Sequence, residues 1–159
     1  VTAANLLVSL NLHGNTFGSE GFVAVIKLLP RCCAIRSLDL GRNGLWSEDG
    51  QFLGRALLRV TTLTELSVAS NSLCVDGLRS LLRELEEHPN LQELDMSDNS
   101  IMRRYGSVAN SITWLMQSKC GSRLRKLNIA GSELTREELF TRERAEETKT
   151  KSRSGLIAV

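Results

Sequence analysis

The sequence predicts an α/β fold: about five strand–helix repeats stacked into a right-handed solenoid, with a parallel sheet on the concave face and helices on the convex face. Two observations predict it. A pattern of aliphatic residues and asparagine recurs along the chain, and apolar residues at helical spacing lie between its copies. No single unit of this kind buries enough apolar surface to fold alone, so each unit depends on its neighbours.

The first pattern reads Leu-x-x-Leu-x-Leu-x-x-Asn-x-Leu and predicts a short strand in each copy, because its alternation gives one buried and one exposed face. Three steps of 28 residues and one of 33 separate the leading residues of the five copies, which are Leu7, Ile35, Leu63, Leu91 and Leu124. The fifth copy has Ser132 in place of asparagine. Such regular spacing is the strongest signal in the chain.

The second pattern places apolar residues at i, i+3, i+4 and i+7, which predicts amphipathic helices. Its stripe begins about one turn later in the second unit than in the others. Gly21, Gly50, Gly77 and Gly106 recur before or at the expected helix starts, where we interpret them as turn residues. The stripes are Phe22, Val25, Ile26 and Leu29; Leu53, Ala56, Leu57 and Val60; and Leu78, Leu81, Leu82 and Leu85.

Strands connected through helices run parallel, and the crossover is expected to be right-handed. Packed helices need about 8–10 Å, whereas parallel strands lie about 4.8 Å apart, so the stack is expected to curve with its sheet inside. A buried carboxamide both donates and accepts hydrogen bonds, so the asparagines are predicted to satisfy the main chain of the turn after each strand. This structural column is Asn15, Asn43, Asn71 and Asn99.

The segment Leu-Asp-Leu-Gly-Arg-Asn-Gly-Leu at residues 38–45 resembles a leucine-rich repeat. The 28-residue length and the true helix resemble the ribonuclease-inhibitor-like class, also found in NOD-like receptors, Ran GTPase-activating proteins, tropomodulin and several ciliary proteins. The resemblance covers about residues 6–140. The resemblance is highly specific for the fold and only weakly specific for the function.

One repeat domain is expected over residues 1–140, followed by a charged helix or disordered tail over residues 141–159. Residues 135–138, Thr-Arg-Glu-Glu, predict a capped last helix. Five extra residues in the fourth unit, between Gly106 and Leu124, are expected to lengthen its helix or the loop after it. The chain lacks an initiator methionine and opens on a repeat strand, so we interpret it as part of a longer polypeptide or complex.

The composition argues against several classes. The chain has 20 basic and 18 acidic residues without a basic block, so no nucleic-acid partner is expected. No apolar run reaches the length of a membrane span. Four cysteines without a Cys-x-x-Cys pair favour a reduced, intracellular and cytoplasmic protein, with a cytoskeletal or ciliary location open. Vicinal Cys32 and Cys33 are expected in a buried turn.

No catalytic motif is present, so the sequence predicts a protein that is not an enzyme and has no cofactor and no metal. The only histidines are His13 and His88, too few for a typical zinc site. His88 precedes a proline at an expected helix end, where a positive charge would suit the helix dipole. His13 is expected to point outward from the first strand, near Asn11 and Asp39.

Outward positions of the expected strands form small or polar columns with an acidic middle. A solvated face and a docking face for a basic partner protein are about equally supported by this pattern. The candidate partner-binding residues are Asn11, His13, Asp39, Glu65, Ser67, Glu93, Asp95, Lys126 and Asn128. Trp46 and Trp114 are possible aromatic anchors, although packing of Trp46 under its loop and of Trp114 against a neighbouring unit is the favoured interpretation.

The function that these patterns favour is a non-enzymatic protein–protein interaction module or scaffold segment of a larger assembly. One alternative, which the Ran GTPase-activating resemblance implies, is a regulator of a small GTPase, with Arg42 and Asn43 as the candidate residues. Another is a structural component of a ciliary or ribonucleoprotein assembly.

Overall fold

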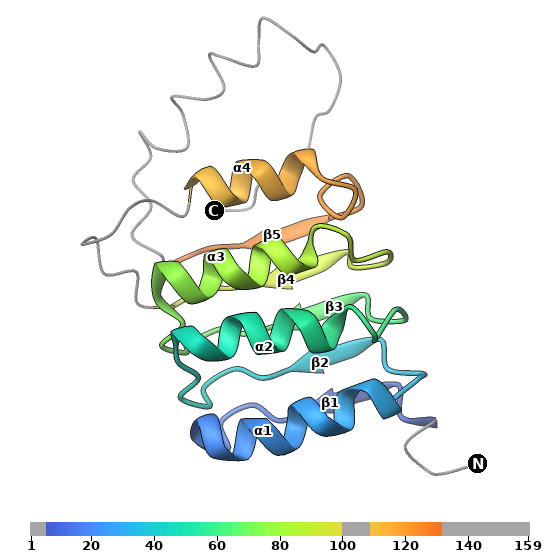
Figure 1. The fold of residues 1–159 in the computed structure, drawn as a ribbon, viewed down its shortest axis with the longest axis vertical. Coiled ribbons are helices and arrows are strands. Elements are labelled where there is room, and N and C mark those ends of the chain that lie inside the picture. The colour runs from blue at the N-terminus through green and yellow to red at the C-terminus, as the bar shows by residue number, and fades with distance from the viewer. Residues whose placement is uncertain (1–5, 100–108, 132–159) are drawn as a thin grey trace, which may run out of the picture.

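The computed structural model describes residues 6–99 and 109–131 of the chain, and these residues form the predicted α/β fold (Figure 1). Five short strands make one parallel sheet in chain order, and the helices lie along one face of it. The strands are β1 (Ser9–Asn11), β2 (Ser37–Asp39), β3 (Glu65–Ser67), β4 (Glu93–Asp95) and β5 (Lys126–Asn128). The helices are α1 (Gly18–Leu28), the short 3-10 helix η2 (Leu29–Arg31), α2 (Ser47–Leu57), α3 (Cys74–Leu85) and α4 (Ala109–Gln117).

The strand register follows the repeat spacing. Ser9 pairs with Ser37, Ser37 with Glu65, Glu65 with Glu93, and Glu93 with Lys126. The 33-residue step before β5 therefore does not shift the alignment. The predictions for Gly106, Ser132, the capped last helix and the tail at residues 141–159 lie outside the described residues.

An aliphatic core fills the space between sheet and helices. The central strand residues Leu38, Leu66 and Leu94 are 1–2% exposed, and the helix residues Leu53 and Leu81 are fully covered. Burying one such side chain contributes about 1.5–3 kcal/mol, and the contacts run between units as well as within them. The core therefore joins the repeats into one cooperative unit.

Glycines inside the helices allow α2 and α3 to pack closely, which corrects the interpretation of Gly50 and Gly77 as turn residues. A Cβ at Gly50 would collide with the main-chain oxygen of Gly77, and one at Gly77 would lie 2.7 Å from Ser47 Cα. The later apolar stripe of the second unit does not reflect a later helix start. α2 begins at Ser47, in step with its neighbours, and Gly50 replaces the large residue found at that place in α1 and α3.

The extra residues of the fourth unit lie mostly before the end of α4. The ends of α3 and α4, at Leu85 and Gln117, are 32 residues apart. The starts of the strands that follow them, β4 and β5, are 33 residues apart. The loop after α4 is therefore only one residue longer than the loop after α3, so it does not hold the insertion. Ile112 and Leu115 of α4 are buried.

His88 is fully buried and neutral, so the prediction of a positive charge at this helix end is wrong. Its Nδ1 accepts the Leu91 N–H at 3.1 Å, and Nε2 lies 3.2 Å from Val60 O. The proton therefore resides on Nε2 and is donated to Val60. Burial lowers the pKa of His88 below 6.5, and the bond to Val60 opposes this only in part.

This burial makes the fold sensitive to acid. Above about pH 6.5 both folded and unfolded His88 are neutral, but below it the unfolded chain takes up a proton that the folded chain does not. The free energy of unfolding should therefore fall by up to about 1.4 kcal/mol per pH unit below that point. Urea unfolding at about pH 7.5 and about pH 5.5 measures this fall. The His88→Gln chain is the control, and an identical pH dependence in both chains would exclude His88 as the cause.

The cysteines divide by position. Cys32 is buried while Cys33 is exposed, so only one of the vicinal pair occupies the expected buried turn. Burial raises the pKa of Cys120 to about 11, which leaves that thiol unreactive. Among the described helices, none is long and apolar enough to cross a membrane.

Candidate protein-binding face

The side of the sheet away from the helices carries the predicted binding residues, and we call this surface the open sheet face. It is formed by the outward-pointing first and third residues of β1 to β5. A shallow depression of about 210 Å³ lies at its centre. The depression is lined by Ser37, Leu38, Asp39, Glu65, Leu66, Ser67, Glu93, Leu94, Asp95 and Lys126.

Negative charge dominates the depression, because four carboxylates and one ammonium group line it. Glu65 and Glu93 are directly opposite on adjacent strands, an arrangement of like charges that costs stability. Lys126 Nζ lies 3.7 Å from Glu93 Oε2, with both side chains about half exposed, so this surface pair is weak. Glu65 is exposed and has no ion pair among the described residues. A cation from a partner would relieve this repulsion.

The third residue of most strands is tied to its own turn. Asp39 Oδ1 accepts the Gly41 N–H at 2.8 Å, and Asp95 Oδ1 accepts the Ser97 N–H at 2.9 Å. Asn11 and Asn128 make the same bond to the N–H two residues further on. Asp95 Oδ2 also accepts the Asn128 amide at 3.0 Å. These side chains therefore have a structural role that their outward position did not reveal.

His13 lies at the first-unit end of the face, as expected, near Asn11 and Asp39. Its Nδ1 is 3.6 Å from Asp39 Oδ1, and its main-chain N–H donates to Asn11 Oδ1 at 2.8 Å. A Cβ at Gly41 would lie 2.6 Å from His13 Nδ1, so the glycine leaves room for the ring. This arrangement orients the imidazole beside the Asp39 carboxylate.

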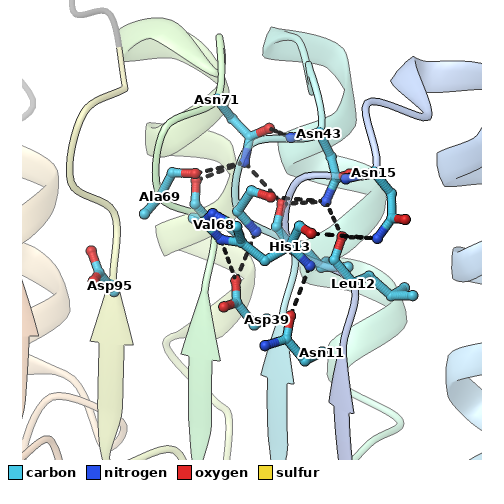
Figure 2. Close-up of polar contacts among 12 residues, drawn as sticks. Asn11, Leu12, His13, Asn15, Asp39, Asn43, Val68, Ala69, Asn71 and Asp95 are labelled. Atoms are coloured by element: carbon cyan, nitrogen blue, oxygen red, sulfur yellow. Dashed lines mark hydrogen bonds and ion pairs between the residues drawn. The ribbon is translucent and has the colours of Figure 1, made fainter.

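The asparagine column joins each turn to the one before it (Figure 2). Asn71 Nδ2 donates to Leu40 O and Val68 O at 3.1 and 2.9 Å, and its Oδ1 accepts the Asn43 N–H at 3.0 Å. Asn43 repeats this pattern, and Asn99 Nδ2 donates to Val68 O and Met96 O in the same way; both residues are fully buried. Asn15 differs, because it is exposed and its side chain bonds only within its own turn. The column holds the turns that end the strands of the open sheet face.

Both tryptophans are exposed. Trp46 is 61% exposed, so it is not packed under its loop, and its main-chain N–H caps α2 by donating to Asp49 Oδ2 at 2.8 Å. Trp114 of α4 is 50% exposed and projects from the helix layer rather than from the open sheet face. Neither side chain lines the depression. The two anchors therefore do not form one site with the acidic residues.

The structure thus brings together most of the predicted binding residues, namely Asp39, Glu65, Ser67, Glu93, Asp95 and Lys126. Asn11, His13 and Asn128 lie on the same face beyond the depression. Ser37 lines the depression but was absent from the candidate residues, although its register with Glu65 could have identified it.

Arg42 and Asn43, the candidate residues for a GTPase regulator, differ in exposure. Asn43 is fully buried in the asparagine column, whereas Arg42 is exposed beside it. Among the described residues, no group of three or more His, Cys, Asp or Glu side chains is placed to hold a metal ion.

Comparisons with known proteins agree with this architecture. The Leucine Rich Repeat family model matches residues 90–115, the unit that contains β4. The tropomodulin C-terminal domain of Caenorhabditis elegans is similar with a TM-score of 0.68 at 15% identity, covering 91% of this chain and 90% of that one. Leiomodin-1 actin-binding site 2 also has a TM-score of 0.68, at 19% identity, covering 89% of this chain and 83% of that one. At these identities the likeness is one of fold.

The repeated strand–turn–helix unit, its asparagine column and the family match are consistent with one another. Residues 90–115 match the leucine-rich repeat, and the same strand–turn–helix unit recurs along the described chain, as the spacing of its leucines predicts.

Proposed function

We propose that this chain is a non-enzymatic protein-binding module that receives a basic segment of a partner protein on the open sheet face. The observation that carries the proposal is the depression with four carboxylates and one lysine at the centre of that face. A Lys or Arg side chain placed between Glu65 and Glu93 would separate two like charges held in register. The complementary charge would also speed the approach of the partner.

The proposal includes a curved architecture. We infer that the units form a right-handed solenoid of the ribonuclease-inhibitor-like class, with the open sheet face concave and the helices convex. The difference between strand and helix spacing supports this curvature. The repeat domain would extend over residues 1–140, with residues 141–159 as a charged tail, and the chain would act as a scaffold segment of a larger intracellular assembly.

Actin is the defined protein that we would test first. The leiomodin-1 domain of similar fold is described as an actin-binding site, and the tropomodulin domain has the same fold. This likeness supports a cytoskeletal location and supplies a probe, while the chemistry of the open sheet face supplies the binding mode. The GTPase-regulator alternative is weaker, because Asn43 is already used inside the fold.

The test reverses charge on the face without disturbing the turns. Glu65→Lys combined with Glu93→Lys changes two side chains that do not bond to their own turns, whereas Asp95 is excluded because it holds the turn at Ser97. Affinity capture and actin co-sedimentation should lose the proteins recovered by the parent chain. The circular dichroism spectrum should stay unchanged.

The matched control makes the same charge change on the helix layer. Glu20 of α1 and Glu48 of α2 are exposed and have no ion pair among the described residues. The chain with Glu20→Lys and Glu48→Lys should recover the same proteins as the parent. If the chain with Glu65→Lys and Glu93→Lys recovered the same proteins as the parent, the open sheet face would not be the binding surface. If both variants lost them, the loss would be due to net charge and not to the face.

A further inference from the structure

The outer side of the first unit, formed by β1 and α1, has main-chain groups that every later unit pairs with the unit before it. Thr64 N–H donates to Arg36 O at 2.8 Å, and Arg36 N–H donates to Val8 O at 2.7 Å. Val8 N–H holds the equivalent position in the first unit, and no described strand lies beyond β1 to accept it. In the second unit, Asp39 O accepts the Leu12 N–H of the first unit at 2.8 Å. Asn11 O holds the equivalent position in the first unit, and no described unit precedes it to supply the N–H.

Asn15 shows the same incompleteness in the asparagine column. Asn43 Oδ1 accepts the Asn15 N–H at 3.0 Å, which joins the second turn to the first. Asn15 Oδ1 accepts no N–H from the described residues, and the residue is exposed where Asn43 is fully buried. Its carbonyl is therefore free to join a further turn.

The outer side of α1 can be compared with the side of α3 that packs against α2. A Cβ at Gly54 of α2 would lie 2.5 Å from Glu84 Cβ and 3.4 Å from Leu81 O, and one at Gly50 would collide with Gly77 O. Two repeat lengths earlier, these three positions of α3 correspond to Gly21, Val25 and Leu28 of α1. On α1 the Phe17 side chain fills the place at Gly21, since a Cβ there would lie 2.5 Å from Phe17 Cβ. Val25 and Leu28 are therefore the positions of α1 that remain open to another helix.

Exposed apolar side chains gather at this end. Among the described residues, four of the seven large exposed hydrophobic residues lie in the first unit or just before it, and two of them occupy places that are polar in later units. Val8 corresponds to Arg36 and Thr64, and Val23 to Gln51. The four are Leu6 at 72%, Val8 at 50%, Val23 at 50% and Leu28 at 55% exposed.

We propose that the β1–α1 side is an interface for a further leucine-rich repeat unit, joined ahead of Leu7 and stacked in the same direction. Its strand pairs parallel with β1, its turn donates to Asn15 Oδ1, and its helix lies against Val25 and Leu28. A lipid surface would leave the main-chain groups unpaired. A second copy meeting this end by two-fold symmetry would pair β1 antiparallel and would not extend the asparagine column.

The test inserts a copy of residues 35–62 between Leu6 and Leu7 and measures amide hydrogen exchange. The copy continues the register, so Val8 N–H should become as protected as Thr64 N–H, its counterpart two units along. A second extended chain carries Gly50→Leu and Gly54→Leu in the inserted copy only, which blocks helix approach and leaves the parent residues untouched. This chain should lose the protection of Val8. A third, with Gln51→Ala in the copy, should keep it.

Two results would overturn the proposal. Val8 exchange as fast in the extended chain as in the parent would show that the end does not accept a repeat unit. Sedimentation showing a dimer of the parent chain, with Val8 protected in that dimer, would assign the surface to a second copy instead.

Discussion

Replacing Asn71 with alanine is expected to lower the free energy of unfolding by about 3–4 kcal/mol. The substitution removes the partners of five main-chain groups in two adjacent turns. These are the carbonyls of Leu40, Val68 and Ala69 and the N–H groups of Asn43 and Leu45. Asn71 is only 5% exposed, so water replaces few of these bonds. Urea unfolding followed by circular dichroism measures the loss.

Asn15→Ala is the matched control for this prediction. Asn15 has the same place in its unit, but it is exposed and its side chain bonds only within its own turn. Its replacement should cost about 1 kcal/mol or less, since water can solvate the freed groups. Equal losses at the two positions would contradict the account of the column as a link between turns.

Gly50→Ala is expected to destabilise the fold by about 2–4 kcal/mol, although alanine normally favours a helix. The new Cβ would meet the main-chain oxygen of Gly77, which cannot turn aside as a side chain can. The helices would have to separate, and the leucines between them would lose contact. Thermal unfolding measures this loss.

Gln51→Ala makes the comparison within the same helix. Gln51 is exposed on α2, so its replacement by alanine should leave the stability unchanged or slightly raise it. A Gly50→Ala chain as stable as the Gln51→Ala chain would show that the α2–α3 distance is not limited by this contact.

Much of the fold was predictable because it repeats. The spacing of the leucines placed each strand, and the sheet register follows it even across the longer fourth unit. The asparagines were predictable for the same reason, as only a side chain that both donates and accepts serves those turns. The pattern located the acidic face as well, because outward strand positions can be read from alternation.

The parts that could not be predicted depend on contacts between units. The helical spacing does not show which faces of α2 and α3 meet, so Gly50 and Gly77 looked like turn residues. His88 stands at a helix end, where a charge is favourable, but Val60 of the preceding unit covers it. The hydrogen bond from Ser97 N–H to Asp95 could not be predicted either, because the alternation of apolar and polar residues shows which side chains are exposed but not which of them form hydrogen bonds.

The central claim is that the open sheet face is the binding surface. Its most direct test is the dissociation constant of a purified partner recovered by the parent chain, measured by titration calorimetry against three chains. The chain with Glu65→Lys and Glu93→Lys should bind on the order of 100-fold more weakly than the parent. The chain with Glu20→Lys and Glu48→Lys should bind as the parent does. An unchanged dissociation constant for the face variant would contradict the account.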